Sequence, residues 1–84
     1  MAGLINFPFK YRSEIKNANE ALTSGIYRIY GVAENAPTFS FGVLVTFNAA
    51  EYILQVANDV GSTNPSAKFR TRNSNGVWSN WKDL

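Results

Sequence analysis

The residues best suited to bind a ligand form a cationic and aromatic set near the end of the chain. Arg70 and Arg72 alternate on one predicted strand, and Trp78, Asn80 and Lys82 alternate on the next. A guanidinium over an indole gives a cation–π attraction of roughly 0.5–1 kcal/mol at an exposed site. An exposed indole beside hydrogen-bond donors also stacks on sugar rings or on single-stranded nucleic acid. These five residues are the predicted ligand or interface set.

Two other roles for this set stay open at this point. Arginine stems can cover an indole across the strands and stabilise the hairpin, which is a purely structural role. The same surface can also serve as a contact between subunits.

The residue types that support catalysis or metal binding are scarce. The chain has no Cys and no His, which excludes thiol chemistry, cysteine-ligated metals and the commonest general base. The six acidic residues show no spacing that selects two carboxyl groups about 5–10 Å apart, as a glycosidase needs. We therefore expect no catalytic residue, no metal site, no cofactor and no enzymatic activity.

Composition bounds the size and the charge of the protein. The 84 residues are 45% apolar, 17% charged and 14% aromatic, which fits one small globular domain of thin stability and favours self-association. The net charge is only +2, with an excess of cations in residues 61–84. No apolar run reaches the roughly 18 residues of a spanning helix, and residues 1–9 do not resemble a secretory signal. We expect no membrane contact.

Three stretches show the two-residue alternation of half-buried strands, at residues 26–32, 39–47 and 52–56. Before them, residues 17–22 predict a short helical turn, with Asn17 as its cap, Leu22 as its packing residue and Gly25 as its stop. The prediction is a mainly β domain, a small antiparallel meander of about five strands with one short N-terminal helical turn.

The final hairpin leaves two registers open. A four-residue turn at Asn73–Gly76 pairs Arg72 with Trp78 and Phe69 with Trp81, whereas a two-residue Asn-Gly turn shifts the pairing by one. In either register one tryptophan joins Phe69 in the core and the other joins the arginines.

The N-terminal segment divides from this domain at about residue 14. Residues 1–14 are predicted to be an arm for docking or assembly, and residues 15–84 the β domain. Clustered exposed apolar side chains usually mark a contact, although a frayed terminus packed on the body is the plain alternative. The docking candidates are Leu4, Ile5, Phe7 and Phe9.

Several short motifs follow one another along the chain. They are the run at 19–31, Asn35-Ala36-Pro37, Phe41–Val45, Tyr52–Val56, Phe69–Arg72 and Gly76–Lys82. Their order resembles the pyocin knob family of phage tail fibres, virion appendages and related bacteriocin fibres. The likeness covers about residues 15–84, and its most specific part is the terminal Trp-x-x-Trp-Lys.

The resemblance implies a β knob on a virion, commonly a homotrimer, that serves attachment to the host cell surface. It carries over no catalytic residue. We therefore expect a structural protein of a bacteriophage tail, baseplate or head fibre, made in the host cytoplasm and located in the virion. Its expected partners are other virion proteins, which the arm at residues 1–9 would contact, and a host cell-surface glycan.

A function from another class remains as the alternative. A small β domain could bind single-stranded nucleic acid through the same cationic aromatic hairpin. The low net charge disfavours this, so no nucleic acid is expected as a partner. Salt dependence separates the two, because phosphate binding weakens steeply with ionic strength and sugar stacking hardly responds.

Overall fold

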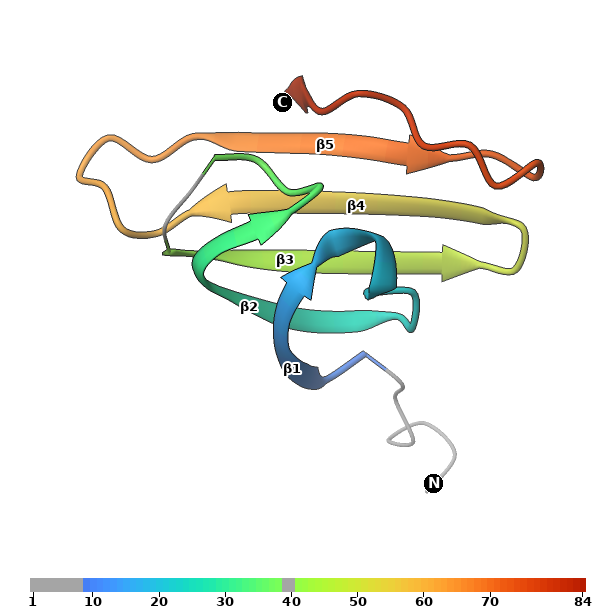
Figure 1. The fold of residues 1–84 in the computed structure, drawn as a ribbon, viewed down its shortest axis with the longest axis horizontal. Coiled ribbons are helices and arrows are strands. Elements are labelled where there is room, and N and C mark those ends of the chain that lie inside the picture. The colour runs from blue at the N-terminus through green and yellow to red at the C-terminus, as the bar shows by residue number, and fades with distance from the viewer. Residues whose placement is uncertain (1–8, 39–40) are drawn as a thin grey trace, which may run out of the picture.

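The computed structural model describes residues 9–38 and 41–84, which form one six-stranded mixed sheet in the order β1-β2-β3-β4-β5-β6 (Figure 1). The predicted mainly β fold is confirmed. The predicted docking residues Leu4, Ile5 and Phe7 lie outside the described residues. The elements are β1 Tyr11–Asn17, the 3-10 turn η1 Ala18–Glu20, β2 Gly25–Glu34, β3 Phe41–Ala49, β4 Tyr52–Asp59, β5 Ala67–Arg72 and β6 Lys82–Asp83.

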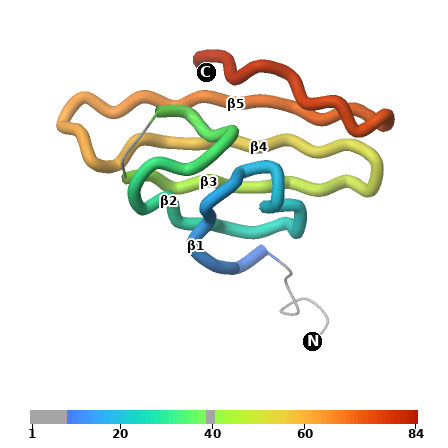
Figure 2. The backbone as a smooth tube through the Cα atoms, in the orientation of Figure 1, coloured from blue at the N-terminus to red at the C-terminus, as the bar shows by residue number. Residues whose placement is uncertain are grey.

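Strands β2 to β5 form the antiparallel meander that the sequence predicts. Figure 2 shows the chain running back and forth between neighbouring strands. One cross-strand row pairs Ile26 with Val45, Val45 with Val56, and Val56 with Phe69. Because successive side chains point to opposite faces, this row and its neighbours at two-residue spacing lie on one face of the sheet. We call this the open face.

The opposite face carries the core, and we call it the covered face. Its buried apolar residues on β2 to β4 include Tyr27, Ile29, Leu44 and Ala57. In β3 the buried positions are therefore the even ones. The apolar odd-numbered positions predicted for residues 39–47 lie on the open face where they are described, and Phe41 is still 46% exposed.

Strand β1 differs from the predicted arrangement. It pairs with β2 in parallel, so the sheet has six strands and one parallel pair instead of about five antiparallel strands. Only Ile15 of its seven residues is buried, and such an edge strand shows no alternation in the sequence. The strand also runs across the predicted boundary at residue 14, since it begins at Tyr11.

The predicted helical turn is present as η1 and is capped by Asn17, whose Oδ1 accepts from the Asn19 N–H at 2.9 Å. Leu22 was predicted to pack this turn, and that prediction is wrong because its side chain is 37% exposed. The contact is made by Ala18 and Ala21, both fully buried. Small methyl groups let the backbone of the turn approach the sheet closely.

Gly25 begins β2 rather than ending a helix. Its φ is +153°, and a Cβ built at this position would lie 2.5 Å from the carbonyl oxygen of Lys10. The backbone at the start of β2 passes close to Lys10 here, and the Ile26 N–H donates to that same carbonyl at 2.9 Å. Only glycine meets both the backbone conformation and this close approach.

Gly25→Ala is expected to destabilise the fold strongly. Backbone strain at positive φ costs about 1–2 kcal/mol, and the clash with Lys10 adds about 1–3 kcal/mol. Gly31→Ala is the matched control, because Gly31 has φ +86° with nothing within 4 Å of the added carbon. Urea unfolding of both variants gives the comparison, and equal losses would contradict the close approach at Gly25.

Candidate functional site

The start of the final hairpin follows the four-residue turn. The Asn73 N–H donates to the Val77 carbonyl at 3.1 Å, and the Gly76 N–H donates to the Asn73 carbonyl at 2.9 Å. Arg72 then pairs with Trp78, which confirms the first of the two predicted registers at this end. Gly76 has φ +79°, the left-handed conformation that such a turn requires.

The register does not continue unchanged toward the chain end. Phe69 pairs with Lys82 instead of Trp81, so one extra residue lies between Trp78 and Lys82. This irregularity places both indoles beside Arg70 on the covered face, and Phe69 lies on the open face. The prediction that one tryptophan would join Phe69 is therefore wrong.

Arg70 lies between the two indoles. Its guanidinium carbon is 3.8 Å from the ring centroid of Trp78 and 4.9 Å from that of Trp81. The side chain also donates from Nε to Gln55 Oε1 at 2.9 Å and from Nη2 to Asn19 Oδ1 at 2.8 Å. Only 4% of Arg70 is exposed, which makes it a buried cation with neutral partners.

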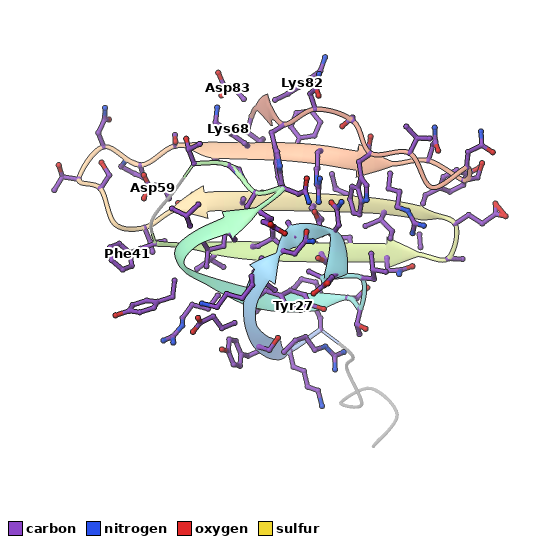
Figure 3. All side chains as sticks on the ribbon, viewed as in Figure 1. Tyr27, Phe41, Asp59, Lys68, Lys82 and Asp83 are labelled. Atoms are coloured by element: carbon purple, nitrogen blue, oxygen red, sulfur yellow. The ribbon has the colours of Figure 1, made fainter. Side chains whose placement is uncertain are left out.

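No carboxylate of residues 9–38 or 41–84 forms a salt bridge with Arg70. The ion pairs there join Glu14 to Lys16 and to Arg28, and they join Lys68 to Asp83, both of which Figure 3 labels. Burial lowers the pKa of Arg70 to about 10, so the guanidinium is still charged at neutral pH. Its charge is balanced by amide oxygens and by the electron-rich faces of the indoles.

The contacts of Arg70 extend to the first half of the chain. Gln55 Nε2 donates to the carbonyls of Ala18 at 3.0 Å and Ala21 at 3.1 Å, which holds η1 against β4. The Trp81 indole N–H donates to the carbonyl of Asn35 at 2.8 Å. With Asn17, which bonds Asn35, the residues joined in this way are called the Arg70 network: Asn17, Asn19, Asn35, Gln55, Arg70, Trp78 and Trp81.

Asn35 closes this network on the opposite side. It has φ +59°, a conformation that Asn tolerates well, and its Nδ2 donates to Asn17 Oδ1 at 3.0 Å. The same Asn17 oxygen caps η1. The Asn-Ala-Pro loop, η1 and the terminal tryptophan motif are therefore connected by specific side-chain contacts.

The five residues of the predicted ligand set do not share one surface. Arg70 is buried inside its network, which is the structural role left open above. Arg72 and Trp78 are half-buried, and their ring-to-guanidinium distance is 5.9 Å. Asn80 and Lys82 are exposed, and Lys82 points away from the sheet at the β6 edge (Figure 3).

Arg72 also lines a hollow at the end of the sheet where β3 turns into β4. The hollow measures about 390 Å³, and its wall is mainly apolar, with Phe47, Tyr52 and Leu54 beside Arg72. Tyr52 is 61% exposed. Phe47 and Tyr52 were not predicted as site residues, although the short turn after β3 gave the signal, since it brings the start of β4 back beside the end of β3.

No model of a known protein family matches the chain, and no curated protein or solved structure is significantly similar to it. Within the described ranges, no three acidic side chains gather as a metal site would require. The same ranges contain no helix with the length and apolar character needed to cross a membrane.

Trp81→Ala is expected to cost about 3–5 kcal/mol of unfolding free energy, the range for truncating a packed aromatic side chain. Trp81 packs against the buried cluster and bonds Asn35, whereas Trp78 contacts Arg70 and Arg72 and is not among the residues packed on that cluster, so Trp78→Ala should cost less. Trp81→Phe keeps most of the ring contact and loses the N–H, which should cost about 1 kcal/mol. Urea denaturation measures all three, and a larger loss for Trp78→Ala would contradict this account.

Proposed function

We propose that the protein is a structural appendage protein of a bacteriophage virion, part of a tail, baseplate or head fibre knob, that serves attachment to the host cell surface as a homotrimer. One observation carries the proposal. The motifs that resemble the pyocin knob family converge on Arg70, through its contacts with Asn19, Trp78 and Trp81 and through the bond from Trp81 to Asn35. This convergence supports treating the separated motifs as one architecture.

Glycan contact is assigned by the proposal to the hollow at the end of β3 and β4. Tyr52 offers an exposed aromatic ring on which a sugar can stack, and Arg72 offers hydrogen-bond donors to hydroxyl groups beside it. Ligand sites of this kind combine an apolar wall with a few directed polar groups. The half-buried Trp78 next to Arg72 extends the aromatic surface at this side.

Glycan binding is tested with a panel of bacterial cell-wall oligosaccharides by isothermal titration calorimetry. Loss of one stacking ring costs about 1–3 kcal/mol, so Tyr52→Ala should weaken binding about 5- to 150-fold. Val77→Ala is the control, because Val77 is exposed and does not line the hollow. Binding that is equal in both variants would contradict the assignment, and a steep fall with salt would favour a phosphate-containing ligand.

Virion incorporation is tested by deleting residues 1–9. Strand β1 begins at Tyr11 and its neighbour Lys10 keeps the bond to Ile26, so the truncated protein is expected to remain folded. Because the proposal makes residues 1–9 the virion contact, the truncated protein should be absent from particles assembled by a phage that lacks the intact copy. Mass spectrometry of purified particles gives the readout.

Phe9→Ala, at a predicted docking residue, measures how much of the loss comes from Phe9 alone. It removes the stack of Phe9 on Phe47, whose centroids are 5.2 Å apart, and leaves residues 1–8 in place. Particles that carry the truncated protein at normal levels would contradict the docking role. Circular dichroism that shows an unfolded truncated protein would instead make these residues part of the core.

A further inference from the structure

The open face of the sheet is apolar across four strands. Its described positions are set by the pairing of β2 to β5, and Arg28 is the one charged residue among them. Asn58 and Thr71 are the polar ones. The apolar and aromatic members are Ile26, Tyr30, Phe41, Val43, Val45, Phe47, Ala49, Tyr52, Leu54, Val56, Ala67 and Phe69.

Much of this face is accessible to solvent. Phe41 and Phe47 are each 46% exposed, and Tyr30 is 56% exposed. The central residues Val45 and Val56 are only half-buried, although β strands flank both of them. By contrast, the covered face of the same strands is closed by η1 and by the Arg70 network.

The size of the face suits a contact between proteins. Seven residues of β3 extend about 24 Å, and four strands at about 4.8 Å spacing are about 19 Å wide, so the face offers about 450 Å² per copy before its rim is counted. The largest apolar patch of an ordinary monomer is about 300–600 Å² and is often functional. A specific interface needs about 1,000 Å² in total, which two such faces with their rims supply.

The charge on the face fits another copy of itself. Its single cation within β2 to β5, Arg28, lies toward β1 and is already paired with Glu14 at 2.9 Å. That bond, followed by the contact of Lys16, holds the pKa of Glu14 below its ordinary value, so the pair stays ionised at neutral pH. Lys82, opposite Phe69, adds a cation only at the β6 rim. Two copies that meet through this face therefore bring together no unpaired like charges at the centre of the contact, where an acidic or basic partner would find nothing to pair with.

We propose that the open face binds the open face of a neighbouring copy of this chain, with Val45 and Val56 near the centre of the contact and the hollow beside Tyr52 at its rim. Sheets that pack face to face lie about 10 Å apart, with apolar side chains interdigitating between them. A domain of this size buries little surface alone, so covering this face also stabilises the fold. In a pair two open faces pack on each other, and in a trimer the three open faces turn toward the three-fold axis. The inference thus rests on the self-association in the proposed function and names its surface, and it can be tested without the virion.

The test is sedimentation equilibrium of the full chain at rising concentration. The wild-type protein should reach a mass of two or three chains. Val45→Glu and Val45→Lys should each stay at 9.3 kDa, with association weakened about 100-fold or more by like charges at the centre of the contact. A mixture of the two variants should associate again, because opposite charges then meet.

Leu22→Glu is the matched control, since Leu22 is 37% exposed and follows η1, which lies on the covered face. It should associate as the wild type does. Circular dichroism establishes that each variant is folded. Should a charge at Val45 prevent folding, Leu54→Glu replaces it, because Leu54 is on the same face and 37% exposed.

The inference is wrong if the wild-type protein stays monomeric at every concentration, or if the Val45 variants associate as the wild type does. It is also wrong if association appears only after deletion of residues 1–8, which would mean that the chain's own N-terminal segment covers the face. A monomer that still enters virions overturns this inference alone, whereas association through the face without incorporation overturns the proposed function alone.

Discussion

The fold depends on a charged guanidinium held between two indoles. Removing Arg70 from water costs several kcal/mol. Two desolvated cation–π contacts of about 2 kcal/mol each and two hydrogen bonds from a charged donor of about 1.5–3 kcal/mol each offset that cost. The balance holds only while Gln55, Asn19 and both tryptophans keep their positions, so one side chain fixes the relation of β4, β5, η1 and the terminal segment.

This arrangement replaces part of an ordinary hydrophobic core. Of the four largest fully buried side chains, Ile29 and Leu44 are apolar, and Gln55 and Thr46 are polar. Both polar residues donate to the carbonyl of Ala21, which a three-residue turn cannot satisfy by itself. Hydrogen bonds in so small a core therefore specify where η1 lies, a task for which apolar contacts alone have little directionality.

The meander was predictable from the sequence because β2 to β4 alternate with a period of two, a strong and local signal. Strand β1 was not, since a single buried residue, Ile15, leaves no pattern. The choice of covered face was also beyond the sequence. In β3 the more apolar set of positions lies on the open face, and the buried set includes Thr46. The partners of Thr46 are Ala21, 25 residues earlier, and Gln55 on β4.

The candidate site was predictable in its residue types and less so in its geometry. The turn at Asn73–Gly76 and the pair of Arg72 with Trp78 follow from local turn chemistry. The extra residue before Lys82 follows from tertiary contacts, because the indole of Trp81 must reach both Arg70 and Asn35. The hollow beside Tyr52 required the register of β4 against β5, which no short stretch of sequence contains.

Two hydrogen bonds of the fold join residues far apart in the sequence, and this matters for the nascent chain. Trp81 bonds Asn35 across 46 residues, and Arg70 bonds Asn19 across 51. As translation proceeds from the N terminus, η1 and the Asn35 loop are made before Arg70 and Trp81, which hold them. Contacts so distant in sequence are slow to form. The bonds of Asn19 to Arg70 and of Asn35 to Trp81 can therefore form only after the terminal tryptophan motif has been made.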